Sequence, residues 1–241
     1  MSGDRDHRTN ILFAMVELTF FTAIISQLMM QLGGGARDKL MDLSDQLIFF
    51  GQAVVFENGL PPYISSAGVF SPESIVFGIG LSIVGAMMMW LSKQVWNETS
   101  EQLQSENTSP IHLRTNNAGL IAGMIGGFAL IILAWTPMHT KLVQHLILAT
   151  LVFSSSILWT ILVTISRTIL DAEEEWRGYK ITRLRWSCLG TSFISIQLSV
   201  ITFVLISPTV SALFEWSLFI SLNCGLLTFY TVFENQDFEE E

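Results

Sequence analysis

Six long apolar segments dominate this sequence, over about 11–32, 74–96, 118–135, 142–165, 184–206 and 210–233. An α-helix needs roughly 20 such residues to cross the hydrocarbon core of a bilayer. Backbone polar groups in lipid must bond within the segment, which favours helices. Only 14% of the residues are charged, against about 25% in soluble domains. The sequence therefore predicts one domain, an all-α polytopic bundle of six transmembrane helices.

The remaining segments lie between and after these spans. The long loop at 33–73 contains an apolar stretch near 46–56, which is too short to cross a bilayer and is predicted as a short interfacial helix. The tail at 234–241 is acidic, and we expect it to be disordered.

Basic residues are distributed unequally between the two sides that six spans define. One side, with both termini, has nine and the other has three, and the larger set marks the cytoplasmic side. The first set is Arg5, Arg8, Lys93, Arg114, Arg167, Arg177, Lys180, Arg183 and Arg185, and the second is Arg37, Lys39 and Lys141. Both termini are therefore predicted to be cytoplasmic, which makes 33–73 an outer loop.

Small residues recur within two spans at helical spacing. Close approach of helices through small residues drives association in lipid, so we interpret them as packing faces. They are Gly78, Ser82, Gly85 and Ala86 in the second span, and Gly119, Gly123, Gly126 and Gly127 in the third.

Ionisable residues at membrane depth are costly and are candidates for function. Glu73, His145 and Glu215 each lie near the outer end of a span, and Glu17 lies in the inner half of the first. Each also has a structural interpretation. Glu73 follows Ser71 and Pro72 as at a helix start, His145 as a neutral ring can bond to a carbonyl, and both Glu17 and Glu215 can extend to the interface. If Glu73, His145 and Glu215 form one site, they should lie within about 10 Å of one another.

A second candidate surface lies between the fourth and fifth spans. Arg177, Lys180, Arg183 and Arg185 alternate there with Trp176, Tyr179 and Trp186. Basic residues interleaved with amphipathic aromatics are typical of contact with anionic inner-leaflet lipid. Simple positive-inside anchoring is the alternative.

Several function classes lack support in the sequence. The net charge of −9 argues against nucleic acid as a partner. There is no Gly-x-Ser-x-Gly elbow, HExxH motif or phosphate loop, and the four histidines are scattered. We therefore expect no catalytic residue, metal or cofactor, although a His–carboxylate pair could act on a lipid ester.

The segment 60–85, LPPYISSAGVFSPESIVFGIGLSIVG, resembles the signature of the damage-regulated autophagy modulators, the DRAM family. The matching residues are Pro62, Tyr63, Ile64, Ser65, Gly68, Pro72 and Glu73, then Asn116, Ala118, Gly119, His145, Glu215, Trp216, Asp237 and Phe238. The same superfamily includes FRAG- and SFK-type proteins, GPI-anchor remodelling proteins and the CWH-type N-terminal domain. This chain has Ser66 where the family usually has aspartate, and a longer stretch at 33–59.

The resemblance implies a six-span membrane protein acting in autophagy, phosphoinositide signalling or lipid remodelling. Combined with the polar residues at the outer leaflet, it leads to a first hypothesis of a non-enzymatic lipid regulator. This protein would bind a lipid headgroup through Tyr63, Ser65, Glu73, His145 and Glu215, and a cytoplasmic partner through loops 97–117 and 166–183. The alternatives are a lipid-remodelling enzyme or its accessory, and a pathway for a small solute or ion.

The predicted orientation is testable at two asparagine sequons. Asn97 and Asn107 lie in sequons on the predicted cytoplasmic side, where glycan transfer does not occur. We expect no glycan at either position when the chain is expressed in a eukaryotic cell, as judged by glycosidase-sensitive gel mobility. A glycan at either asparagine would reverse the orientation.

Overall fold

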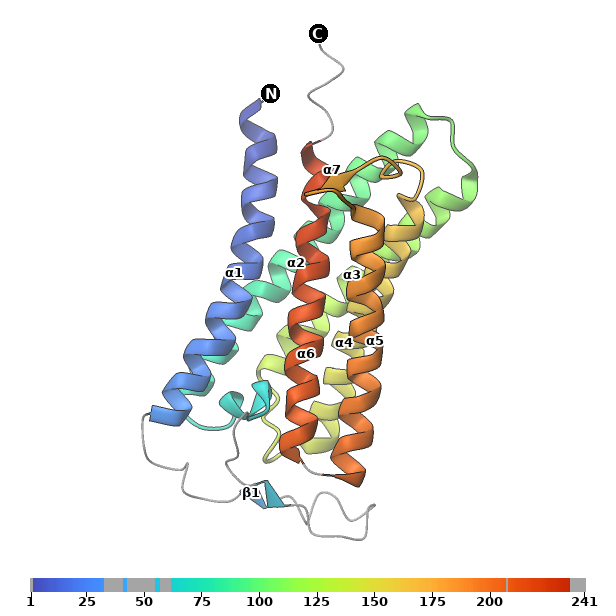
Figure 1. Cartoon of the computed structure of the whole chain (residues 1–241). Helices are drawn as coiled ribbons and strands as arrows, with labels where there is room; N and C mark the ends of the chain where they lie inside the picture. Colours follow the sequence, from blue (N-terminus) through green and yellow to red (C-terminus); the bar gives the residue numbers. More distant parts are fainter. Residues whose placement is uncertain (1, 33–40, 43–54, 57–61, 207, 235–241) are drawn as a thin grey trace.

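The computed structural model describes residues 2–32, 41–42, 55–56, 62–206 and 208–234. Six long helices form a bundle (Figure 1), and all six are apolar enough to cross a membrane. They are α1 (Ser2–Leu32), α2 (Glu73–Ser105), α3 (Pro110–Ala134), α4 (Leu142–Ser166), α5 (Ile181–Leu205) and α6 (Pro208–Leu227). The predicted six-span all-α membrane fold is confirmed.

Short elements complete the described chain. The two 3₁₀ helices are η3 (Ile64–Gly68) and η4 (Thr228–Tyr230), and η4 leads into α7 (Thr231–Glu234). Two antiparallel pairs of two-residue strands are β1 (Met41–Asp42) with β2 (Val55–Phe56), and β3 (Glu175–Trp176) with β4 (Tyr179–Lys180). The interfacial helix predicted near 46–56 falls outside the described residues except for β2, and of the tail at 234–241 only Glu234 is described.

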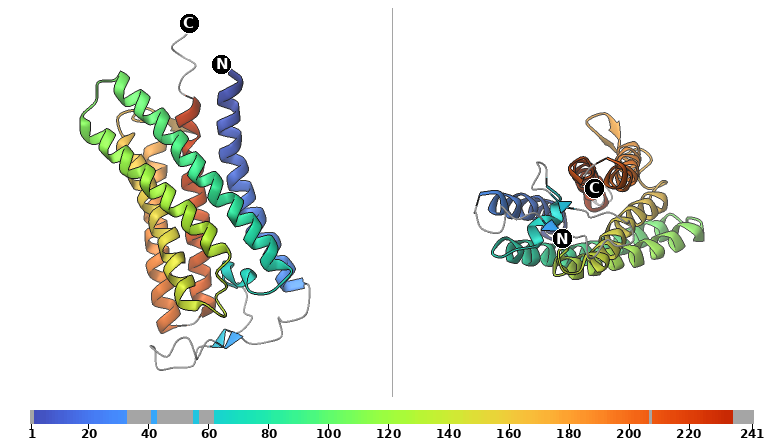
Figure 2. Two further views of the ribbon diagram at one scale, coloured as in Figure 1. Left: turned by 180° about the vertical axis from the view of Figure 1, so that it is seen from behind. Right: turned by 90° about the horizontal axis from the view of Figure 1, so that it is seen from below.

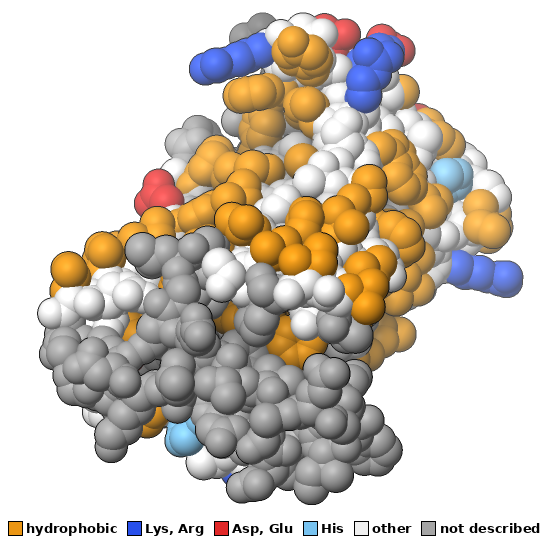
Figure 3. All heavy atoms as spheres, turned by 60° about the horizontal axis from the view of Figure 1, so that its bottom comes forward, with side chains coloured by type: hydrophobic (Ala, Val, Ile, Leu, Met, Phe, Trp, Pro, Cys, Tyr) orange, Lys and Arg blue, Asp and Glu red, His pale blue; other side chains and the backbone are white. Residues whose placement is uncertain are grey.

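The start of α1 and the end of α7 lie at the same end of the bundle, here called the terminal end (Figure 1). The opposite end, here the distal end, carries η3 and the connections from α3 to α4 and from α5 to α6. Seen along its axis, the bundle has α1 to α4 in one curved layer, with α5 and α6 packed against one side (Figure 2). Hydrophobic side chains cover most of the visible side, and most visible charged side chains gather at the terminal end (Figure 3).

Helices α2 and α3 continue beyond the predicted spans. The segment 97–117, predicted as a loop, is mostly helical, and the connection itself is only 106–109. Asn107 has a φ of 48° there, a left-handed conformation that asparagine tolerates. The 33 residues of α2 extend about 50 Å, longer than the roughly 30 Å hydrocarbon core. The α2–α3 hairpin therefore projects past the membrane at the terminal end.

The predicted small-residue faces pack against neighbouring helices: Gly85 of α2 and Gly127 of α3 meet directly, whereas Gly119 and Gly126 face α4. A Cβ added to Gly85 would lie 2.6 Å from the Gly127 carbonyl oxygen, and one added to Gly127 would lie 2.6 Å from that of Gly85. A Cβ on Gly123 would collide with Ser92 Oγ of α2. The two backbones approach so closely because these positions carry no side chain.

Helices α5 and α6 are joined by paired serines. Hydroxyl groups meet in pairs along the two helices, Ser192 with Ser221 at 2.8 Å, Ser195 with Ser217 at 3.0 Å and Ser199 with Ser211 at 3.0 Å. Hydrogen bonds between helices substitute for the hydrophobic effect where both neighbours and solvent are apolar.

A buried ion network connects the helices at the terminal end. Asp171 lies in the connection after α4, and its carboxylate accepts hydrogen bonds from Arg167 Nε at 3.0 Å and Arg167 Nη2 at 2.8 Å. Arg185 Nη1 of α5 donates to Oδ2 of the same carboxylate, the oxygen that also accepts from Arg167 Nε. All three residues have an exposed fraction of 0%. A buried carboxylate held between two guanidiniums needs no solvent to balance its charge.

The two arginines extend this network to the rest of the bundle. Arg167 Nη1 donates to Thr99 Oγ1 at 3.0 Å and to Gln102 Oε1 at 2.9 Å on α2. Arg185 donates to Thr228 and Thr231 near the C-terminus, and its guanidinium lies 4.4 Å from the ring centre of Phe229. One cluster therefore connects α2, α4, α5 and the η4–α7 segment.

The close approach of α2 and α3 predicts a difference between two glycines. Gly127→Ala should lower the free energy of unfolding by about 1–3 kcal/mol, because its new methyl group meets backbone atoms. Gly119→Ala is the matched control on the same helix, since its Cβ would lie 3.4 Å from the nearest atom. Thermal unfolding in detergent measures both variants, and equal stability would contradict the packing described.

The ion network predicts a dependence of stability on pH. Burial alone would raise the pKa of Asp171, but the guanidiniums of Arg167 and Arg185 outweigh it and lower this pKa. The carboxylate therefore stabilises the fold above the ordinary aspartate pKa, and this contribution is lost as the pH falls through the lowered one. Asp171→Asn should cost about 3–5 kcal/mol at neutral pH, and the gap to wild type should narrow below about pH 4.

Unfolding of both proteins measured across pH tests this expectation. Glu173→Gln is the matched control on the same connection, because the Glu173 side chain is 93% exposed and its charge is screened by solvent. A gap between Asp171→Asn and wild type that does not change with pH would contradict the assignment.

Candidate functional site

The proline–tyrosine–isoleucine–serine run forms η3 and the residues before it, and we call 62–68 the distal plug. Gln27 of α1 donates from Nε2 to the carbonyl oxygens of Tyr63 at 2.7 Å and Ile64 at 3.0 Å. From α6, Glu215 Oε2 accepts the Ile64 N–H at 2.9 Å, and Trp216 Nε1 donates to the Pro62 carbonyl at 2.9 Å. Short 3₁₀ turns leave backbone groups unpaired, and these side chains pair them.

Apolar contacts seat the plug in the bundle. Ile64 and Ala67 are buried in a cluster with Phe77 of α2 and Phe219 of α6. Phe20 of α1 packs edge-to-face on Phe219, with ring centres 5.0 Å apart. The plug therefore closes the space between α1, α2 and α6 at the distal end.

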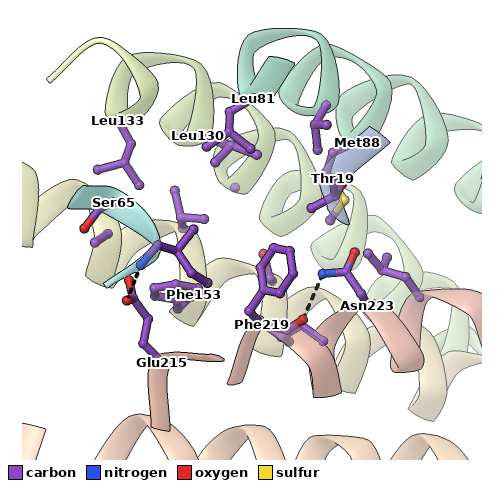
Figure 4. A pocket seen from close by; sticks show the side chains of 18 of the residues that line it. Thr19, Ser65, Leu81, Met88, Leu130, Leu133, Phe153, Glu215, Phe219 and Asn223 are labelled. Carbon is purple, nitrogen blue, oxygen red and sulfur yellow. Dashed lines mark hydrogen bonds between the residues drawn. The ribbon is translucent and has the colours of Figure 1, made fainter. Parts of the chain in front are cut away.

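A narrow cavity runs from the plug towards the terminal end through the middle of the bundle (Figure 4). This central cavity has a volume of about 130 Å³ and is lined by α1, the plug, α2, α3, α4 and α6. Its α2 wall reaches from Phe77 to Met88, a span of about 16 Å along a helix. Its lining is mainly apolar, with polar side chains grouped near the two ends.

A second cavity opens between α4, α5 and α6. This lateral cavity has a volume of about 310 Å³, and Tyr63 and Ser65 of the plug line it together with Leu146, Thr150 and Val200. The last three are exposed on the outer surfaces of α4 and α5. The lateral cavity is therefore reached from the side of the bundle, which the surrounding lipid covers.

The two cavities share a polar junction. Ser65, His145 and Glu215 line both cavities, and Ala149 and Phe153 complete the shared wall. We call Ser65, His145 and Glu215 the junction. The junction is therefore the polar part of the wall that the two cavities have in common.

Each junction residue has a defined hydrogen-bonding state. His145 is 5% exposed, and its Nδ1 lies 2.6 Å from the Thr136 carbonyl oxygen. Because a carbonyl only accepts, Nδ1 carries the hydrogen, and Nε2 of the neutral ring is an acceptor. Glu215 uses Oε2 for the plug, and Ser65 Oγ lies 3.7 Å from Met138 Sδ.

Tyr63 adds a phenol beside the junction. Burial raises the pKa of Tyr63 above its ordinary value, a hydrogen bond with Ser211 lowers it, and the charge of Glu215 raises it further. The net effect is a rise, so the phenol keeps its proton at neutral pH and remains a potential donor. Neither cavity has a Lys or Arg among its described lining residues.

Four of the five predicted headgroup residues are thus brought together, namely Tyr63, Ser65, His145 and Glu215. Glu73 is separate. It is the first residue of α2, is 2% exposed, and lines neither cavity. The expected serine cap is also not formed, because the residue before α2 is Pro72 and no side chain caps the helix. Glu17 is exposed on α1.

The predicted inner-leaflet set divides in the same way. Arg177, Lys180 and Arg183 are exposed around the β3–β4 hairpin, whose turn has positive φ at Arg177 and Gly178. Arg185 requires a correction. Its side chain is fully buried in the ion network with Asp171, so it is not available to lipid. The prediction for Arg185 was wrong because its place in a run of basic residues does not reveal whether its side chain is exposed or buried.

Several polar residues of the central cavity were not among the predicted site residues, and two of them have a polar atom without a partner in the described part of the chain. Asn223 is 5% exposed and Trp159 is 0% exposed, and both line that cavity. Asn223 was not selected because it is not ionisable, although an amide at membrane depth is itself a signal of a functional site. Trp159 lies in mid-span, away from the interfaces where tryptophan is usually enriched.

Comparison with known proteins agrees with the architecture. No curated protein and no solved structure matches the chain. The sequence model of one family, described as the Frag1/DRAM/Sfk1/Cwh43P N-terminal domain, matches residues 10–236. The match includes all six long helices, the plug and the junction residues, and the chain is a multi-pass membrane protein that belongs to the Frag1/DRAM/Sfk1/Cwh43P N-terminal domain family.

Proposed function

We propose that this protein is a non-enzymatic regulator that binds one membrane lipid by way of the lateral cavity, with an uncharged, hydroxyl-bearing headgroup at the junction. The observation that carries the proposal is that Ser65, His145 and Glu215 line both cavities. Buried polar groups at membrane depth are costly unless they bond to something. A lipid headgroup supplies hydroxyl groups that bond to all three.

The absence of basic residues supports an uncharged headgroup. Among the described residues that line either cavity, Glu215 is the only acidic residue and none is Lys or Arg. Phosphate recognition usually relies on arginine or lysine, and a phosphate would be repelled by a charged Glu215. A hydroxyl group instead donates to Glu215 or His145 Nε2 and accepts from Tyr63.

Glu215 offers a route from lipid to regulation. The same carboxylate that faces the cavities accepts the Ile64 N–H of the plug. A headgroup bonded to Glu215 therefore changes the strength with which α6 holds residues 62–68. On the predicted topology this event lies at the outer leaflet, where the headgroups are.

The readout is proposed at the terminal end. The projecting α2–α3 hairpin within 97–117 and the connection within 166–183 provide surface for a cytoplasmic protein partner. Exposed Arg177, Lys180 and Arg183, with Trp176 and Tyr179 also exposed, support contact with anionic inner-leaflet lipid. Autophagy-type signalling and membrane lipid homeostasis are the processes that the family resemblance suggests for this regulation.

Native mass spectrometry of the detergent-purified protein tests the lipid proposal. Wild type should retain a defined neutral lipid, and His145→Ala should retain at least about fivefold less, because one hydrogen bond is worth about 1 kcal/mol. His139→Ala is the matched control, a histidine at the same end that lines neither cavity. Thermal unfolding confirms that each variant is folded.

The other outcomes separate the competing functions. No retained lipid in wild type, or equal amounts in wild type and His145→Ala, would refute the headgroup site. Product formation from the retained lipid by purified wild type, lost in folded His145→Ala, would replace the regulator with the lipid-remodelling enzyme. Solute or ion flux in liposomes that depends on Glu215 would replace it with a transport pathway.

A further inference from the structure

The terminal-side end of the central cavity carries two polar atoms that the fold leaves unsatisfied. Asn223 donates from Nδ2 to the Phe219 carbonyl oxygen at 2.8 Å (Figure 4). This hydrogen bond fixes the orientation of the amide, so that Oδ1 is the atom left to accept. Within the described part of the chain, neither Asn223 Oδ1 nor Trp159 Nε1 has a hydrogen-bond partner. Buried polar atoms of this kind are rare in native structures and call for an explanation.

These two atoms have complementary hydrogen-bonding requirements. Trp159 Nε1 can only donate, and Asn223 Oδ1 can only accept. The cavity wall includes the apolar side chains of Met15, Met88 and Leu226. It also includes Thr19 and Thr160, whose hydroxyl groups donate to carbonyl oxygens of their own helices. An oxygen function such as a hydroxyl group both accepts and donates, so it matches what these two residues offer.

The distance to the junction is set by α6. Asn223 follows Glu215 by eight residues on that helix, which corresponds to about 12 Å along its axis. Between these positions the cavity is lined by apolar side chains such as Phe219, Leu222 and Leu130. The cavity is narrow and elongated, as expected for one alkyl chain or one slender ring system.

We infer that the central cavity binds the apolar part of a lipid that carries a hydroxyl group about 12 Å from its headgroup, with this hydroxyl at Asn223 and Trp159. The inference rests on the proposed function, because the headgroup of the same lipid lies at the junction. The inference extends the proposed function by assigning Asn223 and Trp159 as the residues that select a hydroxylated chain over an unsubstituted one. A chain without the oxygen leaves both polar atoms unsatisfied.

Two monoglycerides that differ by one hydroxyl group test the inference on the full-length protein. Monostearin and its mid-chain hydroxylated counterpart have the same uncharged headgroup. Wild type in detergent should bind the hydroxylated form about five- to tenfold more tightly by native mass spectrometry titration, the value of one added hydrogen bond. Asn223→Leu should bind both equally, with the affinity for monostearin unchanged or raised.

Additional variants separate this inference from the headgroup site. Trp159→Phe removes the indole N–H and should reduce the preference, whereas Asn117→Leu, on the exposed surface of α3, should retain it. His145→Ala should weaken both monoglycerides by the same factor and leave their ratio unchanged. Thermal unfolding identifies any variant that does not fold. If one of Asn223→Leu and Trp159→Phe does not fold, the other variant decides the result.

Each outcome has one meaning. Equal binding of both monoglycerides by wild type would overturn the oxygen site, since a water molecule would then satisfy Asn223 and Trp159, and it would leave the headgroup site standing. Binding of neither by wild type would overturn the neutral headgroup site and with it this inference. A preference for the hydroxylated form that survives in both Asn223→Leu and Trp159→Phe would also overturn the assignment.

Discussion

The carboxylate of Asp171 between the guanidiniums of Arg167 and Arg185 is the interaction on which the arrangement of the last three long helices depends. It joins the end of α4 to the start of α5 and, through Thr228 and Thr231, to the C-terminal end of α6. Helices α4 and α5 remain in contact near this end, where Ile157 packs with Leu189. Towards the distal end the lateral cavity lies between them. A strong connection at one end thus permits an opening at the other.

Much of the fold followed from the sequence because lipid imposes simple rules. Long apolar runs must be helices, and small residues at helical spacing must face a neighbour, as Gly85 and Gly127 do. Helix ends were less predictable. The polar residues of 97–117 carry no apolar pattern, so nothing in the sequence indicated that α2 and α3 continue through them beyond the membrane.

The candidate site was predictable in part. His145 and Glu215 were visible because ionisable groups are rare at membrane depth, and they do line the same cavities. Glu73 was selected by the same criterion, an ionisable group at membrane depth, but it is the first residue of α2 and lines neither cavity. Arg185 was assigned to the surface because a linear pattern does not reveal a partner 14 residues away. Trp159 and Asn223 were missed because neither side chain is ionisable, although an amide and a mid-span tryptophan are signals in themselves.

The buried network also bears on how the chain enters the membrane. Arg167 and Arg185 contribute to the basic excess that orients the spans, yet both are absent from the folded surface. A nascent chain presents them as free cations next to the emerging helices, and the finished protein uses them as internal connectors. A map of the folded exterior would therefore underestimate the charge that guided insertion, and neutralising either arginine would disturb biogenesis and stability through two separate physical causes.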